Sequence, residues 1–305
     1  MEYAFGELTV ACTHVERLVF PADGLTKGDV LAYYRDVAEL MVPELRGRPL
    51  SVVRYTKGIS AGGFFQKHYQ KHYPAWLGHV RAGSKTIVDY PIVDTPAGVV
   101  YLANQGALEF HVWTSRADAL DRPDMLVFDL DPPDGGDGFE PVRRTAAIVR
   151  ELCAQLGLPA FVKTTGSKGL HVVSPLDDAA TFAAAGALAT RIGALLCRRH
   201  PAVMTMEFYK KDRKGRLFLD VMRNAPGATL VAPYSLRGHP GAPVSAPLAW
   251  DELGDPALRA SSIRLGDVRA RLDRRGDPWR ELRAALGSVA RAMRALDELA
   301  DAPDR

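Results

Sequence analysis

The chain has 305 residues, of which 47% are hydrophobic and 25% charged, and a formal net charge of +3 at pH 7. This is the composition of an ordinary soluble globular protein, and so small a net charge does not by itself indicate a nucleic-acid-binding protein. The three cysteines, Cys12, Cys153 and Cys197, form no CxxC pair. They argue against a cysteine zinc site and a disulfide scaffold, and they are typical of a reducing compartment.

Neither a signal peptide nor a membrane span is expected. The N-terminus lacks a basic region followed by an apolar stretch. The longest apolar segment, 179–197, carries Arg191 and begins after two aspartates, so it predicts a helix packed on the core. We therefore expect a cytoplasmic protein without a membrane partner.

In the first half of the chain, short apolar runs predict strands and one amphipathic stretch predicts a helix. The expected elements are a strand at 8–10, a loop at 21–29, a helix from Val30 to about Met41, a strand at 49–55, a glycine-rich loop at 62–76, and strands at 85–93 and 107–113. Lys27 lies where the helix should begin, and there backbone N–H groups and the helix dipole favour an anion.

The second half alternates strands and helices without a regular βαβ rhythm. The expected elements are a strand at 125–131, a helix at 141–158, two strands around a turn at 160–176, an alanine-rich helix at 179–197, a hairpin-like strand pair at 204–224, and loops at 225–249. We predict an α/β (α+β) fold of mixed β-sheets flanked by helices. It should form one domain over 1–305, with a core at about 1–250 and C-terminal helices at about 251–300 packed on it.

The strand MLVFDLD ends in two carboxylates, Asp129 and Asp131. Side chains alternate along a strand, so both point to one face with their Cα atoms about 7 Å apart. Such a pair can bridge one cation, or hold two about 4 Å apart as in two-metal phosphoryl transfer. Oxygen ligands favour Mg²⁺ or Mn²⁺ over zinc. The alternative is that both carboxylates cap turns at the strand end.

Two further motifs bear on the same chemistry. GRLFLDVMRN delivers Asp220 from an apolar run in the same way, although an ion pair with Arg223 or Arg216 is the simpler interpretation. KTTGSKGLHVV holds a donor-rich turn that suits a triphosphate. It lacks the Walker pattern, and as an isolated turn it is no more than a common hairpin.

In combination, FDLDP, SKGLH and LDVMRN followed by APYSLRG resemble the polymerase domain of bacterial ligase D, in the archaeo-eukaryotic primase superfamily. The resemblance covers nearly the whole chain. It implies a primase-polymerase catalytic core with an N-terminal DNA-binding part. The implied activity is template-directed transfer of NTPs or dNTPs to a primer 3′-hydroxyl.

The resemblance also implies roles for individual residues. The metal-binding and catalytic carboxylates would be Asp129, Asp131 and Asp220. The nucleotide would be bound by His111, Thr165, Ser167, Lys168, His171, Arg223 and Arg237. DNA would be bound by Arg17 and Lys27 at a 5′-phosphate, and by Phe64 and Phe65 stacked on template bases. The chain departs from the family pattern in having Thr164-Thr165-Gly166 before the turn, and Arg17 where a lysine can occur.

The implied cofactors are two Mn²⁺ or Mg²⁺ ions, and the implied partners are a nucleotide and gapped or 3′-overhanging DNA with a 5′-phosphate. By resemblance the protein would act in gap filling or non-homologous end joining at the bacterial nucleoid, with a separate ligase and Ku as candidate partners. No ligase or nuclease module is recognised within the 305 residues, so a stand-alone polymerase is expected.

Two other classes of protein share part of this pattern. A haloacid-dehalogenase-like phosphatase also places a DxD motif after an apolar strand, but here Pro132-Pro133 follows the second aspartate. A non-catalytic nucleic-acid-binding module would use only the basic segments. Three aspartates near DNA phosphates would be costly without a metal, which disfavours that interpretation. His68 and His72 lie in a basic-aromatic stretch that indicates a DNA-facing segment rather than a metal site.

Overall fold

The structure is a computed structural model that describes residues 1–83, 86–133 and 139–301. The chain forms two compact units, each assembled from three separate segments. The first unit comprises Met1–Asp118, Thr229–Ala246 and Ser261–Asp277, and the second comprises Ala119–Ala228, Pro247–Ala260 and Pro278–Arg305. Whether the two units act as the single catalytic domain expected from the sequence stays a prediction.

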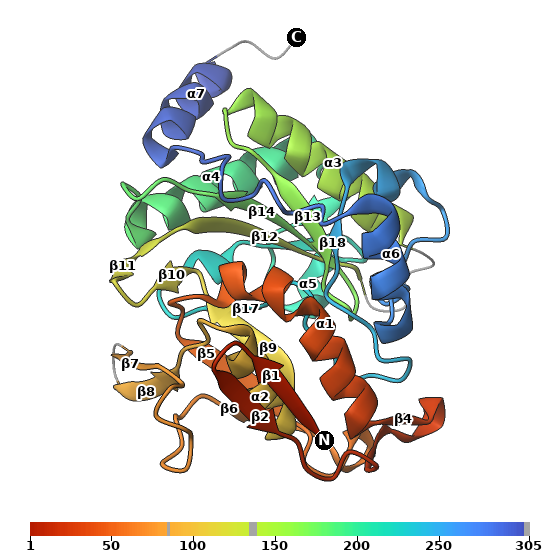
Figure 1. Ribbon diagram of the computed structural model, residues 1–305. Helices are drawn as coiled ribbons and strands as arrows, with labels where there is room; N and C mark the ends of the chain where they lie inside the picture. Colours follow the sequence, from red (N-terminus) through yellow and green to blue (C-terminus); the bar gives the residue numbers. More distant parts are fainter. Residues whose placement is uncertain (84–85, 134–138, 302–305) are drawn as a thin grey trace. The chain divides into compact units, whose positions relative to one another are not determined.

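The first unit is built on a four-stranded antiparallel sheet. Its strands, in spatial order, are β17 (Thr229–Val231), β9 (Ala107–Trp113), β5 (Leu50–Arg54) and β6 (Phe64–Gln66). Helices α1 (Lys27–Leu45) and α2 (Pro96–Asn104) pack against each other (Figure 1). The fully buried Tyr34 of α1 fixes the helix to the sheet, because its hydroxyl donates to the carbonyl of Leu108 and accepts from the N–H of Leu236.

Short elements complete this unit. They are the paired strands β1 (Glu2–Phe5) with β2 (Leu8–Ala11), β3 (Leu18–Phe20) with β4 (Leu25–Thr26), and β7 (His79–Ala82) with β8 (Val88–Pro91), strand β10 (Ser115–Arg116), and helix α6 (Val268–Arg275). Of the strand expected at 85–93, residue 85 lies outside the described residues, and β8 occupies the middle of the rest.

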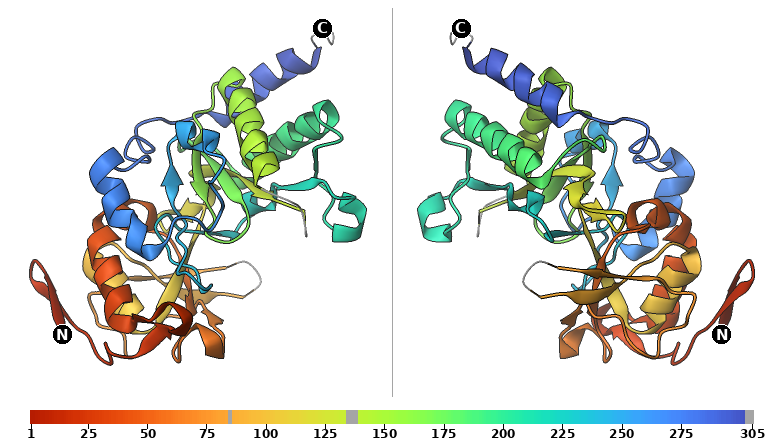
Figure 2. Two further views of the ribbon diagram at one scale, coloured as in Figure 1. Left: turned by 90° about the vertical axis from the view of Figure 1, so that its right-hand side faces the viewer. Right: turned by 90° about the vertical axis from the view of Figure 1, so that its left-hand side faces the viewer.

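The second unit is built on a six-stranded mixed sheet. Its order is β15 (Met204–Thr205), β16 (Leu217–Asp220), β12 (Met125–Asp131), β14 (Leu170–Pro175), β13 (Phe161–Thr164) and β18 (Pro247–Leu248). Helices α3 (Glu140–Gln155) and α4 (Phe182–Arg199) lie side by side on one face of this sheet (Figure 2). Helix α7 (Val289–Asp301) packs on α4, and β11 (Ala119–Pro123) and α5 (Lys210–Arg213) complete the unit.

The predicted α/β class with mixed sheets is confirmed, and two strands match their predicted bounds. β9 is ALEFHVW and β12 is MLVFDLD, residue for residue. All of β12 from Met125 to Leu130 is buried. Burial on both faces explains why this strand shows an unbroken apolar run rather than alternation.

Other predictions were wrong in detail. The segment at 204–224 is not a hairpin, because β15 pairs with β16 in parallel and α5 lies in the connection between them. Part of the expected loop at 62–76 forms the edge strand β6. The loops expected at 225–249 contain β17 and β18. A helix also begins earlier than expected, at Lys27, because Thr26 and Asp29 form a capping box.

No helix in the described residues is long and apolar enough to cross a membrane.

One buried side chain takes the place of a strand in the sheet. β16 pairs with β12 only from Asp129 to Asp131. At Val127 the side chain of Asn224 makes the hydrogen bonds that a neighbouring strand would make. The Asn224 Oδ1 accepts from the N–H of Val127, and the Asn224 Nδ2 donates to the Val127 carbonyl, each at 2.8 Å. Asn224 therefore prolongs the hydrogen bonding of β12 beyond the end of its neighbour.

Asn224→Ala should lower the free energy of unfolding by about 2–3 kcal/mol, because it leaves a buried N–H and a buried carbonyl of β12 without partners. Urea denaturation measures this loss. The matched control is Asn104→Ala, which removes the same pair of bonds, to Thr13 and Ala11, at a partly exposed site. Water replaces those bonds, so equal losses in the two variants would contradict the role given to Asn224.

Candidate functional site

A row of ionisable side chains crosses four neighbouring strands of the second unit. In the strand register, Lys163 lies opposite His171, His171 opposite Asp129, and Asp129 opposite Asp220. Directly paired residues share a face of a sheet, so the four side chains form one line. All four are at most 5% exposed.

Asp131 joins the row from the next same-face position of β12, opposite Phe218. The register therefore brings Asp129, Asp131 and Asp220 to one face of the sheet, as the sequence predicted. Their roles as metal ligands and catalytic residues stay predictions.

The carboxylates lie beside two side-chain nitrogens and one backbone N–H. The Nε of Arg223 lies 3.2 Å from Oδ2 of Asp129 and 3.7 Å from Oδ2 of Asp220. The Nε2 of His171 lies 3.3 Å from Oδ1 of Asp129. Asp220 also accepts a hydrogen bond from the N–H of Met222 at 2.7 Å. Arg223 is thus the positive side chain that holds two strands' carboxylates together.

The pKa values of these groups diverge. Burial alone would raise the pKa of Asp129, but His171 and Arg223 outweigh it and lower the pKa to about 2. Burial, reinforced by the charges of Asp129 and Asp220, raises the pKa of Asp131 to about 6. Burial also raises the pKa of Asp220. Three carboxylates on one face therefore repel one another, and this repulsion contributes to the raised pKa of Asp131.

His171 is neutral at pH 7. Burial first, and then the neighbouring charge of Lys163, lower the pKa of its imidazole to about 4. At neutral pH the imidazole therefore adds no charge next to Asp129, and the positive charge beside Asp129 is that of Arg223.

The Gly-Ser-Lys turn is closed by Thr165. The Thr165 hydroxyl donates to the carbonyl of Gly169 and accepts from the N–H groups of Ser167 and Gly169, at 3.1–3.3 Å. Thr165 is buried, whereas Lys168 is exposed. In this structure Thr165 organises the turn, and Lys168 is the residue that the turn presents outward.

Gly169 seats this turn against the carboxylates. A Cβ at this position would lie 2.0 Å from the carbonyl oxygen of Leu130, on the strand that carries both aspartates. Only glycine permits so close an approach between the two backbones. The spacing of the SKG motif therefore fixes Lys168 close to the end of β12.

The carboxylate oxygens at this site are of the chemical type that binds a divalent cation. Oδ1 of Asp129 is buried and has no hydrogen-bond partner among the described residues. The acids Asp129, Asp131 and Asp220 supply the hard oxygen atoms that Mg²⁺ and Mn²⁺ prefer. Over 1–83, 86–133 and 139–301, however, no three His, Cys, Asp or Glu side chains are already arranged around one metal position.

A second polar cluster lies in the first unit, around the buried Glu109 of β9. Its Oε2 lies 3.1 Å from Nε2 of His111 and 3.0 Å from Nε of Arg237. Its Oε1 accepts from the Tyr55 hydroxyl at 3.2 Å and the N–H of Gly238 at 3.0 Å. Glu109 thus joins two residues that the sequence assigned to nucleotide binding.

The predicted 5′-phosphate residues also lie in the first unit. Lys27 is 3% exposed, and its Nζ donates to the carbonyl of Thr13 at 2.6 Å. Burial and the neighbouring Arg17 lower the pKa of Lys27 to about 8. Two cations are thus close together, and the buried Nε of Arg17 has no hydrogen-bond partner in the described part of the chain.

The start of α1 differs from expectation in one respect. The N–H groups of Lys27, Gly28 and Asp29 are already bonded, to Arg17, Val15 and the Thr26 side chain. An anion here would be bound by side chains, because these backbone groups are occupied.

The aromatic pair of β6 is exposed, with Phe64 49% and Phe65 55% accessible. The two rings leave opposite faces of the strand. The Phe65 ring lies 5.8 Å from that of His111, whereas the Phe64 ring lies under the guanidinium of Arg54, 5.6 Å from its centre.

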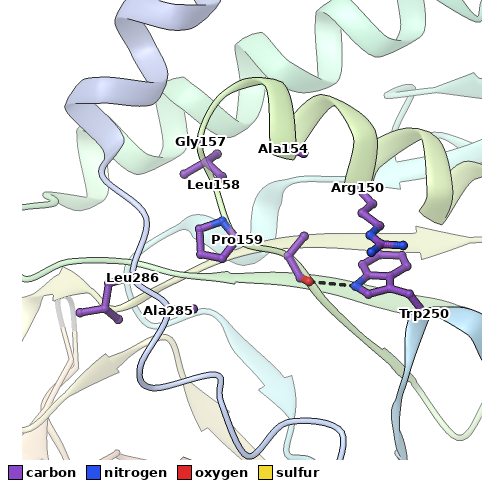
Figure 3. A pocket seen from close by; sticks show the side chains of 9 residues that line it. Arg150, Ala154, Gly157, Leu158, Pro159, Trp250, Ala285 and Leu286 are labelled. Carbon is purple, nitrogen blue, oxygen red and sulfur yellow. Dashed lines mark hydrogen bonds between the residues drawn. The ribbon is translucent and has the colours of Figure 1, made fainter.

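A cavity of about 520 Å³ lies apart from these residues in the second unit (Figure 3). Trp250 forms one wall, with Arg150 stacked on its indole at 4.7 Å and the indole N–H donating to the carbonyl of Ala160 at 2.9 Å. None of the residues that the sequence assigned to a site lines this cavity.

Sequence reasoning missed Glu109, Asn224 and Lys163. Glu109 interrupts the apolar alternation of ALEFHVW, and an acid inside a strand is a signal that it needs partners. Lys163 gives the same signal in FVKT. Asn224 carries no such signal, because a loop asparagine is ordinary until its contact with β12 is known.

The fold and the carboxylate row together indicate a class of protein. A mixed sheet that presents three acids beside a glycine-rich turn with a lysine is typical of metal-dependent nucleotidyl-transfer enzymes. The comparisons with known proteins agree. Residues 26–279 match the model of the family described as "LigD, primase-polymerase domain".

The relatives give the same result. The chain is 38% identical over 283 residues to the multifunctional non-homologous end joining protein LigD of Mycobacterium bovis, covering 89% of this chain and 36% of that protein. It is 32% identical to the LigD protein of Pseudomonas aeruginosa, over 93% of this chain and 34% of that protein. The chain thus spans about a third of these relatives.

Among solved structures, the polymerase domain of Mycobacterium tuberculosis ligase D in complex with DNA matches with a TM-score of 0.85 and 36% identity, covering 91% of this chain and 99% of that one. The chain belongs to the LigD primase-polymerase domain family. Members of this family are nucleotidyltransferases, so the phosphatase and the non-catalytic module are no longer supported.

The Glu109 cluster predicts a pH dependence. Burial alone would raise the pKa of Glu109, but its hydrogen bonds and charges, His111 first and then Arg237, lower it from 4.5 to about 2. A pKa lowered by folding stabilises the protein above the unfolded-state value, and this stability is lost as the pH falls toward the folded-state value. Wild type should have a larger free energy of unfolding than Glu109→Gln at pH 5. This difference should shrink by up to about 3 kcal/mol between pH 5 and pH 2. Urea denaturation across this range measures it, and a constant difference would contradict it.

Proposed function

We propose that the chain is a template-directed primase-polymerase that adds NTPs or dNTPs to a primer 3′-hydroxyl. The observation that carries the proposal is the placement of Asp129, Asp131 and Asp220 on one sheet face, with the Lys168 turn seated against the same strand. Phosphoryl transfer needs this combination, because acids hold the cations while a cation-bearing turn meets the triphosphate.

In this proposal the three aspartates hold two divalent ions, with Mn²⁺ preferred over Mg²⁺. When bound, these ions activate the primer hydroxyl and neutralise charge on the triphosphate. Arg223 keeps Asp129 and Asp220 together while both are charged. Burial first, and then repulsion from Asp129 and Asp220, raise the pKa of Asp131, and a neighbouring cation would offset both effects, which supports this assignment.

The nucleotide would be bound by residues from several elements. Lys168 and Ser167 would bind phosphate oxygens from the turn, and Thr165 would keep the turn closed. The neutral His171 would orient Asp129. We also assign His111 and Arg237 to nucleotide binding.

For DNA, we propose that Lys27 and Arg17 bind a 5′-phosphate and that Phe64 and Phe65 stack on template bases. The natural substrate would be a gap or a 3′-overhanging end with a 5′-phosphate. The names of the relatives support a role in non-homologous end joining. A ligase and Ku are the partners that such a role requires.

The function is tested by extension of a fluorescent primer across a short gap that bears a 5′-phosphate, with Mn²⁺, and with NTPs and dNTPs in separate reactions. Templated addition is expected, and the nucleotide that is added faster defines the sugar preference. Well-folded protein that adds neither nucleotide would refute the proposal.

Asp131→Asn should reduce primer extension at least about a hundredfold, because the amide keeps the shape of the carboxylate but loses the charge that binds a cation. The single-turnover rate at saturating Mn²⁺ measures this effect. Asp178→Asn, an exposed position in the same unit, is the matched control and should extend at the wild-type rate. An active Asp131→Asn protein would refute the assignment.

Lys27→Met should weaken binding to a 5′-phosphorylated gap while changing binding to the unphosphorylated gap little, because the side chain keeps its apolar stem but loses its charge. Fluorescence anisotropy with the two gapped DNAs, which differ in one phosphate, measures the ratio of affinities. An equal loss on both DNAs would show that Lys27 supports the fold and does not recognise the phosphate.

A further inference from the structure

A long segment of the first unit contains no acidic residue. Asp and Glu make up 36 of the 305 residues, yet none occurs between Glu44 and Asp89. The same segment contains eight lysines and arginines and three histidines. It forms β5, β6, β7 and the loop that connects β6 to β7. This part of the unit is therefore positive although the whole chain is nearly neutral.

Side chains of this segment form an unbroken series of contacts that begins at Phe64. Arg54 covers the Phe64 ring and donates from Nη1 to the Gln66 side-chain oxygen at 2.7 Å. The Gln66 amide donates to the Tyr73 hydroxyl at 2.8 Å. The rings of Tyr73 and Tyr69 lie 5.2 Å apart.

The series ends on β7. The His79 ring lies 4.6 Å from that of Tyr69 and is tilted by 34° to it. The side chain of His79 is 51% exposed, and its Nδ1 is bonded to Asp89 at 2.7 Å, so the first acid after the acid-free segment is already paired. We call the surface from Phe64 through Tyr69 to His79 the aromatic strip.

Cations flank the aromatic strip. Lys67 and Lys71 lie in the loop that carries Tyr69, and Lys71 and Arg81 are exposed. Neither Lys67 nor Lys71 has a side-chain ion pair within the described residues. In this series the rings of Phe64 and His79 are exposed, Tyr69 is half-buried and Tyr73 is buried. Accessible rings beside unpaired cations are the pattern of a surface that binds single-stranded nucleic acid, because every base offers a face to stack on and every nucleotide a phosphate.

Resting on the proposed function, we propose that the aromatic strip binds the single-stranded template that has not yet been copied. Phe64 and Phe65 then have different roles, because they leave opposite faces of β6. Phe65, beside His111, contacts the template base at the site of synthesis. Phe64 begins the strip and receives the next bases of the strand.

The charge favours a nucleic acid over an acidic protein segment as the occupant. An acidic peptide would satisfy the lysines but would leave the rings of Phe64 and His79 without a planar partner. A single strand of DNA satisfies both sets at once.

The test uses the full chain and fluorescent primer–template duplexes whose template overhang is 2 or 12 nucleotides long. Fluorescence anisotropy gives the dissociation constant for each DNA. Wild type should bind the 12-nucleotide overhang at least about tenfold more tightly than the 2-nucleotide overhang. In Lys67→Ala/Lys71→Ala this ratio should fall to about threefold or less. The dependence of log affinity on log salt should also weaken by about 1.4 for the longer overhang.

Two comparisons make the test specific. Arg291→Ala/Arg294→Ala removes two exposed cations from α7 and should keep the wild-type ratio. Phe64→Ala should lower the ratio, whereas Phe65→Ala should weaken binding of both DNAs by the same factor. Equal behaviour of the two phenylalanine variants would overturn the division of roles.

The outcomes separate this inference from the proposed function. Wild-type protein that extends the primer but binds both overhangs equally would overturn the inference alone. An equal loss of affinity for both DNAs in Lys67→Ala/Lys71→Ala would also overturn it, since the lysines would then contact the duplex. Overhang-dependent binding without any extension would overturn the proposed function and leave the strip as a binding surface.

Discussion

The second unit depends on keeping like charges together at the centre of a sheet. Asp129 and Asp220 are direct cross-strand partners, and directly opposed like charges destabilise a sheet. Arg223 offsets this repulsion with one guanidinium that lies between 3 and 4 Å from both carboxylates. The strand that carries the acids is held in place by neighbours: Asn224 prolongs its hydrogen bonding, and Gly169 lets the next turn pack directly on it.

The charges along the row are graded. Lys163 stands at one end, the neutral His171 follows, and the acids occupy the other end. The imidazole separates the buried ammonium from Asp129. If Lys163 paired directly with Asp129, the two charges would neutralise each other and the acid would attract a further cation less strongly. With a neutral histidine between Lys163 and Asp129, Arg223 is the charged side chain that contacts Asp129 in the described part of the chain.

The sequence predicted what local pattern controls. The bounds of β9 and β12 follow from their apolar runs, and the shared face of Asp129 and Asp131 follows from alternation along one strand. It did not predict contacts between distant segments. Glu109 meets Arg237 across more than a hundred residues, and β15 and β16 pair in parallel although a hairpin-like pair was expected there. Neither strand pairing nor ion pairing at such distances leaves a periodic signal.

The carboxylates of Glu109 and Asp131 differ in how many hydrogen-bond donors they meet, and this difference gives the two acids different electrostatics. Glu109 accepts from a hydroxyl and a backbone N–H and lies beside an imidazole and a guanidinium, so its pKa falls to about 2. Its oxygens have no remaining capacity for a metal. Asp131 has no hydrogen bond or ion pair to its side chain within the described residues, and its pKa rises to about 6. A half-buried acid without donors is stabilised when it is protonated or meets a cation. At neutral pH a cation is the stronger partner, and in the proposed function Asp131, rather than the well-bonded Glu109, would meet that cation.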